Sequence, residues 1–169
     1  MKNIILTGFM GTGKTTVGKL LAAQLGYAFV DTDQVIEAQA GRSIPSIFAE
    51  LGEAAFRQIE RDVASQLAAR DGLIISTGGG MMLDPANVAA LSHTGRIFCL
   101  VATPEEILSR IQTDDQHVRP LLQGPNPSER ITELLSQREQ AYGRFQQIHT
   151  TGKQPNEVAH DLLRLIKTI

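Results

Sequence analysis

Short apolar runs alternate along the chain with segments whose apolar residues recur at helical spacing. From Val17 to Leu25 these residues lie three or four positions apart and predict a helix that ends at Gly26. A second stripe of the same period runs from Ala55 to Leu67. The runs expected to form strands are residues 3–7, 28–31, 73–76, 96–101 and 147–151. Strands of this kind are expected to be buried on both faces, and their alternation with helices predicts βαβ units and a parallel sheet.

Three helices are expected to begin at a proline. In each case a residue with a capping side-chain oxygen precedes it: Asp84-Pro85, Thr103-Pro104 and Asn126-Pro127. Proline is favoured at the first helical position because the N–H that it lacks would have no partner there. The sequence therefore predicts helix N-termini at these three prolines.

The composition limits the class of protein. The 169 residues suffice for one domain and are too few for two ordinary ones. The net charge is −2 and Lys and Arg do not cluster in the sequence, so no nucleic-acid partner is expected. Cys99, the only cysteine, lies in an apolar run and is expected to be buried without a disulfide. No signal-peptide pattern and no stretch approaching the ~18 apolar residues of a membrane span is present, so a cytoplasmic protein without membrane association is expected.

Residues 8–15 read Gly-Phe-Met-Gly-Thr-Gly-Lys-Thr and match the phosphate-binding pattern G-x-x-x-x-G-K-[ST]. The motif lies between the first expected strand and the first expected helix, which argues against a chance glycine-rich turn. Its backbone N–H groups and the helix N-terminus are expected to surround one phosphate chain. Lys14 would add a positive charge at the terminal phosphates, and the Thr15 hydroxyl suits a magnesium ion. The motif predicts a nucleotide site with Mg²⁺.

Two carboxylates follow the second expected strand, in the sequence Asp31-Thr32-Asp33. One of them is suited to hold magnesium through water, and the other to accept a proton from an attacking hydroxyl. Helix capping by Asp33 explains the same residue equally well, because aspartate is also a favoured N-cap. The spacing alone leaves both interpretations open.

The apolar strand at residues 74–76 runs into three glycines, Gly78, Gly79 and Gly80. Three consecutive glycines leave no side chains to pack, which favours a ligand close to the backbone. A flexible turn is the alternative, although a turn needs only one glycine. The carboxyl ends of parallel strands face one crevice, so residues 8–15, 31–33 and 78–80 are expected to meet there.

Two arginines stand out on expected helices. Arg138 lies on an apolar helix stripe, four residues after Leu134, so it needs an anionic ligand or a structural salt bridge. Arg57 lies one turn from Glu53 and Glu60, and a solvated charge ladder explains it without any ligand.

A third arginine, Arg119, lies in a loop over about residues 112–125, where it is suited to cover a transferred phosphoryl group. Proline and glycine interrupt this loop, which is expected to be mobile. The four histidines show no metal-ligand spacing, and no structural zinc site is expected.

These motifs occur together in an order that resembles bacterial shikimate kinases, and the resemblance covers nearly the whole chain. Only the phosphate-binding loop is shared with many other nucleotide enzymes. The motifs are residues 8–15, Asp31-Thr32-Asp33, Phe56-Arg57-x-x-Glu60, Thr77-Gly78-Gly79-Gly80, Arg119-Pro120-Leu121-Leu122 and Arg138-x-x-x-Tyr142.

The resemblance implies a three-layer α/β/α fold of the phosphate-loop, nucleoside-monophosphate-kinase-like type. Its five-stranded parallel sheet would have the order 2-3-1-4-5. Residues 1–169 would form a single kinase domain, with a substrate-binding segment at about 32–62 and a mobile lid at about 112–125. The implied reaction transfers the γ-phosphate of ATP to the 3-hydroxyl of shikimate, giving shikimate 3-phosphate and ADP in aromatic amino-acid biosynthesis. A protein of this family and size is expected to act as a monomer.

The resemblance also assigns roles to residues. Lys14 and Arg119 would stabilise the transferring group, and Asp33 would orient or deprotonate the hydroxyl. The shikimate-binding residues would be Asp33, Phe48, Phe56, Arg57, Glu60, Gly78, Gly79, Gly80, Arg119, Leu121 and Arg138. The nucleotide-binding residues would be Gly11, Thr12, Gly13, Lys14, Thr15, Thr16, Arg119, and Arg110 and Pro155 at the adenine. Mg²⁺ would be held by Thr15 and, through water, by Asp31 and Ser76.

One segment departs from the family pattern. Similar proteins often carry a further lysine or arginine in the lid, whereas here residues 114–118 read Asp-Asp-Gln-His-Val. Arg119 is therefore the one cation that the resemblance assigns to the lid.

Two other functions are alternatives to that of a shikimate kinase. Another small-molecule kinase of this fold, such as a gluconate kinase, would share the phosphate-binding loop but need not have both Arg57 and Arg138. A nucleotide-binding module without transfer activity would leave the three glycines and Arg138 without a ligand. The guanine-reading motif N-K-x-D of GTPase switches is absent.

Overall fold

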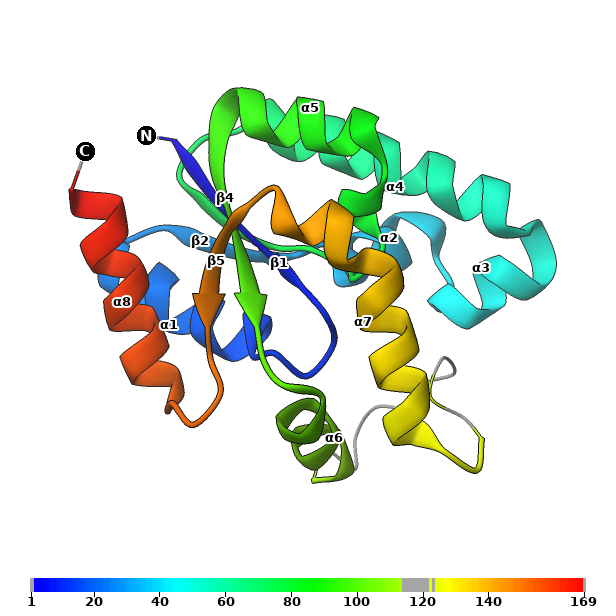
Figure 1. The fold of residues 1–169 in the computed structure, drawn as a ribbon. Helices are drawn as coiled ribbons and strands as arrows, with labels where there is room; N and C mark the ends of the chain where they lie inside the picture. Colours follow the sequence, from blue (N-terminus) through cyan, green and yellow to red (C-terminus); the bar gives the residue numbers. More distant parts are fainter. Residues whose placement is uncertain (1, 114–121, 123, 169) are drawn as a thin grey trace.

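Five parallel strands form one sheet in the order β2-β3-β1-β4-β5 (Figure 1). The computed structural model describes residues 2–113, 122 and 124–168. The strands are β1 (Asn3–Gly8), β2 (Ala28–Asp31), β3 (Leu73–Ser76), β4 (Gly95–Val101) and β5 (Gln146–His149). The five predicted strands and the implied strand order are confirmed. β5 ends earlier than predicted because a turn begins at Thr150, whose carbonyl accepts the Lys153 N–H at 3.1 Å.

Helices cover both faces of the sheet, so the predicted three-layer α/β/α architecture is confirmed (Figure 1). In the described residues the helices are α1 (Lys14–Leu25), α2 (Thr32–Ala40), α3 (Ile44–Leu51), α4 (Glu53–Ala68), the 3-10 helix η1 (Met81–Leu83), α5 (Pro85–Thr94), α6 (Pro104–Gln112), α7 (Pro127–Gly143) and α8 (Pro155–Lys167). Alternate residues of β1 explain the layers: Ile4 and Leu6 share a core with α1 and α8, whereas Ile5 shares one with α4 and α5. A central strand with apolar residues on both faces requires cover on both.

The predicted helix starts are present, but their caps differ. The Asp84 carboxylate accepts the N–H of Ala86 at 2.9 Å, and the Thr103 hydroxyl accepts that of Glu106 at 3.3 Å. Asn126 is an exception, because its side chain caps no backbone N–H and its amide instead donates to the Glu129 carboxylate at 3.2 Å. Proline at the first position is therefore sufficient to set the start of α7.

The loops at the carboxyl ends of the strands meet at one edge of the sheet, as predicted. The N–H of Thr77, just after β3, donates to the Leu6 carbonyl at 3.0 Å. On the other side of β1, the N–H of Thr150 donates to the Val101 carbonyl at 2.8 Å. These bonds hold the residue after β3 beside β1 and the residue after β5 beside β4, at the edge where the candidate site lies.

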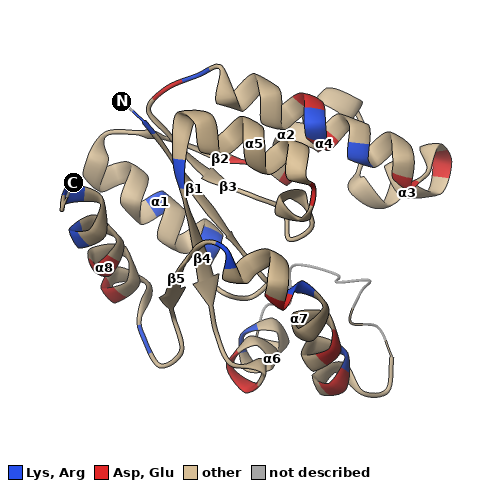
Figure 2. Ribbon diagram, turned by 45° about the horizontal axis from the view of Figure 1, so that its top comes forward, with Lys and Arg blue, Asp and Glu red and all other residues tan. Residues whose placement is uncertain are grey.

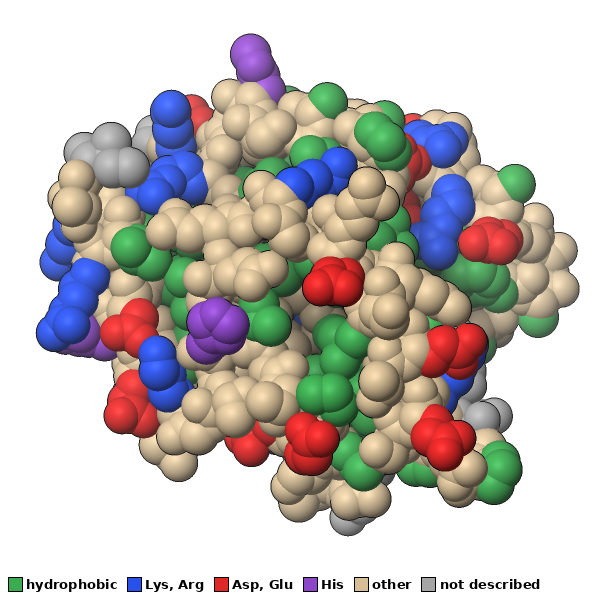
Figure 3. Space-filling view, in the orientation of Figure 1, with side chains coloured by type: hydrophobic (Ala, Val, Ile, Leu, Met, Phe, Trp, Pro, Cys, Tyr) green, Lys and Arg blue, Asp and Glu red, His purple; other side chains and the backbone are tan. Residues whose placement is uncertain are grey.

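Acidic and basic residues both occur on each of α4, α6, α7 and α8, and charges of both signs are visible on the face in Figure 3 (Figures 2 and 3). Positive charge is therefore not concentrated on these helices. Within the described part of the chain, no helix has both the length and the apolar character needed to cross a membrane. The predicted lid falls mostly on residues 114–121 and 123, which lie outside the described residues.

Candidate active site

The predicted phosphate-binding loop connects β1 to α1, and its glycines are required by the backbone. Gly8, Gly11 and Gly13 have φ values of 133°, 75° and 96°, a region that other residues rarely adopt. At Gly8 a Cβ would also collide with the Leu100 carbonyl oxygen of β4. Gly13 is the N-cap of α1 and has no side chain to cap its first turn. The N–H groups of that turn thus remain available to an anion.

Two side chains of the loop donate hydrogen bonds to its own backbone carbonyls. The Lys14 ammonium donates to the carbonyls of Gly8 and Phe9 at 2.8 and 2.9 Å, which places its charge within the curve of the loop. Thr12 is buried, and its hydroxyl donates to the Phe9 carbonyl at 2.7 Å. Of the threonines predicted to bind the nucleotide, Thr15 and Thr16 are exposed and Thr12 is not. We therefore expect Thr12 to contribute through its backbone.

Two of the three predicted magnesium residues, Asp31 and Ser76, end adjacent strands, and Thr15 lies beside Asp31 in the first turn of α1. Thr15 Oγ1 is 3.4 Å from Asp31 Oδ2, and Asp31 is the register partner of Ser76 in the sheet. A hydroxyl, a carboxylate and water suit Mg²⁺ bound to a nucleotide, because this ion prefers oxygen ligands and keeps several waters. In the described residues no group of three or more His, Cys, Asp or Glu is arranged to hold a metal. The residues present fit a nucleotide-bound magnesium ion.

The two aspartates after β2 have different roles. Asp31, not Asp33, is the N-cap of α2, and its Oδ1 accepts the N–H groups of Asp33 and Gln34 at 3.0 and 3.5 Å. The interpretation of Asp33 as a helix cap is therefore wrong. The Asp33 carboxylate is directed at Gly78, where a Cβ would lie 2.5 Å from its Oδ1.

Asp33 has a pKa that suits acid–base chemistry. Burial raises the pKa of this carboxyl to about 6, with further upward contributions from the Asp31 and Glu60 carboxylates, and the Lys14 ammonium partly opposes them. With a pKa of about 6, the carboxyl is mostly ionised at neutral pH and can accept a proton more readily than an ordinary aspartate. Asp33 is thus poised to exchange a proton.

Each of the three consecutive glycines faces a charged side chain from a different helix. A Cβ on Gly78 would meet Asp33 of α2, a Cβ on Gly79 would lie 3.0 Å from Arg138 Nη1 of α7, and a Cβ on Gly80 would lie 3.0 Å from Arg57 Nη1 of α4. None of the three glycines has a positive φ. Gly79 and Gly80 do lie in a turn, in which the Met81 N–H donates to the Gly78 carbonyl at 3.1 Å, but this turn does not require glycine for its φ values. The glycines are needed for space, because three charged groups converge on them.

Arg57 is held by carboxylates on its own helix. Its Nη1 donates to Glu60 Oε2 at 2.6 Å, and its Nη2 lies 3.6 Å from Glu53 Oε1. Glu60 is only 2% exposed, and burial raises the pKa of its carboxyl against the opposing effect of Arg57. The predicted charge ladder is present, but its main partner is buried and the guanidinium faces Gly80. The ladder thus accounts for how Arg57 is held, and the role of Arg57 toward a ligand stays a prediction.

Arg138 has a different environment. Its Nη1 donates to the Tyr142 hydroxyl at 3.4 Å, and its guanidinium carbon lies 5.4 Å from the centre of the Phe9 ring. It forms no ion pair with an acidic residue in the described part of the chain. A partly buried arginine beside an aromatic ring still has most of its donors to offer. An anionic ligand is thus the better of the two partners expected from the sequence.

Two phenylalanines border the site near Arg57. The rings of Phe48 on α3 and Phe56 on α4 lie 4.5 Å apart between centroids, and Phe48 is 39% exposed whereas Phe56 is buried. Phe56 also packs against the Arg57 guanidinium, 5.2 Å from ring centre to guanidinium carbon. The pair offers an apolar surface to the ring of a small substrate.

The two residues predicted at the adenine lie across the phosphate-binding loop from these groups. Arg110 of α6 donates from Nη1 to the Gly11 carbonyl at 3.3 Å and from Nη2 to the Thr150 carbonyl at 2.9 Å. Its charge is balanced by Glu106 at 2.9 Å. Pro155 is the first residue of α8, after the turn that begins at Thr150. Arg110 therefore joins the phosphate-binding loop to the segment that leads to Pro155.

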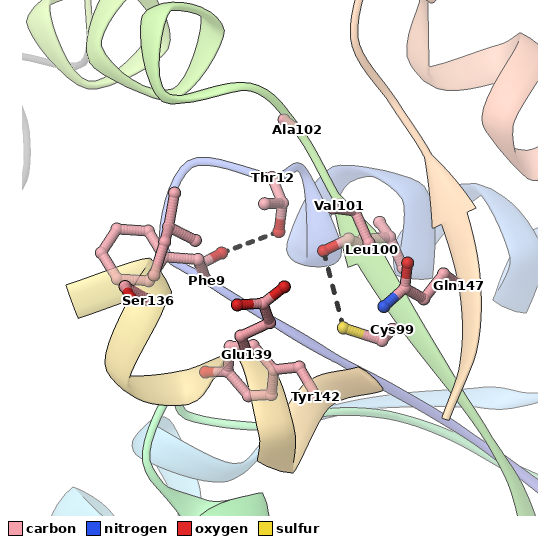
Figure 4. Close-up of a pocket in the computed structure, with 11 residues that line it drawn as sticks. Phe9, Thr12, Cys99, Leu100, Val101, Ala102, Ser136, Glu139, Tyr142 and Gln147 are labelled. Atoms are coloured by element: carbon pink, nitrogen blue, oxygen red, sulfur yellow. Dashed lines mark hydrogen bonds between the residues drawn. The ribbon is translucent and has the colours of Figure 1, made fainter. Parts of the chain in front are cut away.

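A cavity of about 290 Å³ next to the phosphate-binding loop lies between the end of β4 and α7 (Figure 4). Phe9 and Tyr142 line it, and the Glu139 carboxylate points into it. On the face in Figure 3, apolar side chains are exposed in this region. No Lys or Arg is among the residues lining this cavity, so it suits an anionic substrate less well than the glycine segment does.

The structure brings together most of the residues predicted for the site, and Arg119 and Leu121 lie outside the described residues. The sequence did not predict a site role for Phe9, Thr32 or Tyr142. Thr32 accepts the Gly78 N–H at 2.9 Å, and Tyr142 donates to the Gly79 carbonyl. Tyr142 lies four residues after Arg138, one helical turn away, and this spacing could have indicated a contact between the two side chains. Phe9 occupies a variable position of its motif, which carried no such signal.

A parallel sheet with this strand order, a phosphate-binding loop after β1 and an adjoining group of one carboxylate and two guanidiniums define a phosphate-loop kinase for a small acidic molecule. A family model described as shikimate kinase matches residues 10–167. The chain is 46% identical over 165 residues to the shikimate kinase of Thermodesulfovibrio yellowstonii, covering 97% of this chain and 94% of that protein. The protein belongs to the shikimate kinase family, which confirms the resemblance of its motifs.

Solved structures give the same family. The shikimate kinase from Acinetobacter baumannii in complex with shikimate has a TM-score of 0.89 and 38% identity, with 98% of this chain and 93% of that chain covered. A gluconokinase from Sinorhizobium meliloti has a TM-score of 0.61 at 16% identity, covering 97% of this chain and 93% of that chain. The second similarity shows a shared fold alone.

Proposed function

We propose that the protein is a shikimate kinase that transfers the γ-phosphate of ATP to the 3-hydroxyl of shikimate, producing shikimate 3-phosphate and ADP. The observation that carries the proposal is the convergence of Asp33, Arg57 and Arg138 on three consecutive glycines beside a phosphate-binding loop. Membership of the shikimate kinase family and the similarity to a shikimate-bound enzyme support it. The similarity to gluconokinase concerns the fold and does not favour the alternative.

The two arginines would hold the carboxylate of shikimate, but they would contribute unequally. Arg57 is already neutralised in part by Glu60 and Glu53, whereas Arg138 has no acidic partner among the described residues. Guanidinium groups bind carboxylates in paired, charge-assisted hydrogen bonds. Arg138 would therefore supply most of the uncompensated positive charge, and Phe48 and Phe56 would border the shikimate ring.

The phosphate-binding loop would hold the ATP phosphates through residues 11–16, with Arg110 and Pro155 at the adenine. Lys14 would stabilise the negative charge that develops on the transferring group. Thr15, with Asp31 and Ser76 through water, would hold Mg²⁺, which when bound neutralises phosphate charge. Arg119 and Leu121, outside the described residues, keep the roles that the resemblance assigned to them.

Asp33 would accept a hydrogen bond from the 3-hydroxyl and take its proton as the oxygen attacks phosphorus. Its carboxylate is directed at the glycine segment, and its burial favours a pKa near 6. Because phosphoryl transfer depends mainly on positioning and charge stabilisation, Asp33 has little to do beyond aligning the hydroxyl and receiving its proton.

The proposal includes the organisation expected from the sequence. Residues 1–169 would form one kinase domain, with about 32–62 binding shikimate and about 112–125 acting as a lid. The enzyme would act as a monomer in the cytoplasm and would bind neither nucleic acid nor membranes.

A coupled assay of ADP release tests the proposed function. ADP release in the presence of Mg²⁺ is expected to depend on shikimate, with gluconate giving only the background rate. Turnover with gluconate instead would favour the other kinase, and nucleotide binding without any transfer would favour a binding module. Lys14→Ala should reduce the shikimate-dependent rate to near background, which excludes a contaminating kinase.

A further inference from the structure

The hydroxyl of Tyr142 lies between Arg138 and the glycine segment. It donates a hydrogen bond to the Gly79 carbonyl and accepts one from Arg138 Nη1 at 3.4 Å. A phenolic oxygen can donate once and accept at the same time, so one group satisfies both neighbours. Tyr142 thus connects α7 to the loop after β3 through the same side chain that contacts Arg138.

The rest of Tyr142 is fixed by apolar packing. The residue is 6% exposed and shares a core with Phe9, Ile131 and Leu134. Burial raises the pKa of its phenol, so the proton that it donates to Gly79 is retained near neutral pH. A ring that is largely buried by apolar packing gives its hydroxyl a more defined position than an exposed tyrosine would have.

Arg138 has few other directional contacts. Phe9 packs against its guanidinium at 5.4 Å, but a ring face attracts a cation without fixing its rotation. No described carboxylate is paired with Arg138, whereas Arg57 is oriented by Glu60. Among the described residues, the Tyr142 hydroxyl is therefore the hydrogen-bonding contact that orients the Arg138 donors.

We propose that Tyr142 is a positioning residue that orients the Arg138 guanidinium toward the carboxylate of the substrate and fixes it relative to the Gly79 backbone. The inference rests on the proposed function for the identity of that carboxylate. Tyr142 acts through Arg138 and touches neither the reacting hydroxyl nor the phosphate.

Removal of the hydroxyl is expected to leave the fold intact. The segment after Gly79 has further anchors, because Asn87 donates to the Met81 carbonyl at 2.9 Å and Arg144 donates to the Met82 carbonyl at 2.8 Å. Phenylalanine retains the packed ring of Tyr142. Tyr142→Phe is thus a suitable variant for the test.

Calorimetric titration with shikimate, and with an analogue that lacks the carboxylate, separates positioning from general damage. We expect Tyr142→Phe to weaken shikimate binding by roughly tenfold, as for loss of a hydrogen bond to a charged group, with an unchanged Kd for the analogue and an unchanged KM for ATP. In an Arg138→Ala background the same substitution should have no further effect on shikimate binding. Equal losses in the two backgrounds, or equal losses for the two ligands, would overturn the proposal.

Tyr27→Phe provides the matched control, because Tyr27 is the other tyrosine of the chain and packs against the core on the α1 and α8 side of the sheet. It should leave both titrations unchanged. A crystal structure of ligand-free Tyr142→Phe tests positioning independently of the substrate. The Arg138 guanidinium is expected to shift while Gly79 and Gly80 stay in place, and an unmoved guanidinium would refute the role of Tyr142. If wild-type protein failed to bind shikimate while this shift occurred, the proposed function would fail and the positioning role would stand.

Discussion

Gly78, Gly79 and Gly80 have φ values that any residue can adopt, so each contributes only the space that a Cβ would fill. The charged groups in that space differ in role, since Asp33 faces the reacting hydroxyl in the proposed complex and Arg138 faces the carboxylate. Neighbouring substitutions of the same kind should therefore affect different kinetic constants. The expected difference between these substitutions arises at the scale of single residues, because a different charged side chain faces each glycine of the loop.

Gly78→Ala is expected to lower kcat by roughly tenfold or more, because its Cβ would lie 2.5 Å from Asp33 Oδ1 and displace the base. Gly79→Ala should instead raise the KM for shikimate, because its Cβ would lie 3.0 Å from Arg138 Nη1. Steady-state kinetics measures both effects. Gly143→Ala is the control, since the nearest atom to its Cβ would be 4.0 Å away. The same kinetic constants altered in both glycine variants would contradict these roles.

The raised pKa of Asp33 predicts opposite effects of Asp33→Asn on activity and stability. The folded protein holds this proton more tightly than the unfolded chain, so Asp33 contributes stability below pH 4 that is lost as the pH rises through about 6. At pH 7 the variant should therefore be more stable than wild type, by on the order of 2 kcal/mol, and at pH 4 the difference should vanish. Urea unfolding at the two pH values measures this difference.

Turnover by Asp33→Asn should be close to background, because asparagine cannot accept the proton. In the wild type, kcat/KM is expected to rise with pH up to about 6 and then to level off, as the free carboxylate forms. A variant with normal turnover, or one less stable than wild type at pH 7, would argue against the assigned role and environment of Asp33.

At the scale of elements, α4 and α7 each present one arginine to the glycine segment, but only α4 carries a buried counter-charge. Glu60 is 2% exposed and is neutralised by Arg57, whereas no described acidic residue depends on Arg138. Removal of the arginine should therefore affect stability in α4 but mainly ligand binding in α7. α4 has its charges partly balanced within itself, and α7 leaves its charge for the ligand.

Arg57→Ala and Arg138→Ala should both weaken shikimate binding, but only Arg57→Ala should lower the free energy of unfolding substantially. Without Arg57 the buried Glu60 carboxylate loses its partner, at a cost of about 1–3 kcal/mol. Shikimate titration and urea unfolding of both variants provide the comparison. Similar stabilities of the two variants would show that Glu60 does not depend on Arg57.

Helix starts offer a second comparison between elements. Thr103→Ala removes the hydroxyl that caps α6 and should lower the free energy of unfolding by about 1 kcal/mol. Asn126→Ala should cost only a few tenths of a kcal/mol, roughly the effect of an exposed surface change, because its side chain caps no N–H of α7. Thermal and urea unfolding of both variants test this difference, and a larger loss for Asn126→Ala would contradict it.

At the scale of the whole molecule, the site exists only when the chain is folded, because Asp33, Arg57 and Arg138 come from three different helices. Shikimate should therefore stabilise the native state. At a concentration of one hundred times Kd the gain is about 2.7 kcal/mol, which corresponds to an increase in Tm of roughly 5–10 °C for a protein of this size. Thermal unfolding with shikimate measures this shift, and gluconate serves as the control. An equal shift in Arg138→Ala at the same shikimate concentration would exclude Arg138 from the binding site.

The sequence predicted the five strands, their alternation with helices and the phosphate-binding loop, because these depend on local patterns. The helices α3 and α8 were not predicted, and the order of the strands in the sheet and the family came from the resemblance of the motifs. Apolar periodicity, capping residues before proline and glycines at a fixed spacing each act within a few residues of one another. The resemblance of the motifs then added a set of site residues. The Asn126 cap was wrong because the same side chain had a nearby carboxylate, Glu129, as an alternative partner.

Only the tertiary structure decided which side chains share a space. The sequence could not show that Asp31 rather than Asp33 caps α2, that each of three glycines faces a different charged group, or that Tyr142 joins Arg138 to the Gly79 carbonyl. These contacts bring together residues up to 63 positions apart, as between Tyr142 and Gly79. They follow from how the helices pack on the sheet, which fixes distances that no local pattern specifies. The sequence by itself thus determined the elements and the chemical groups of the site, and the packing of those elements determined their partners.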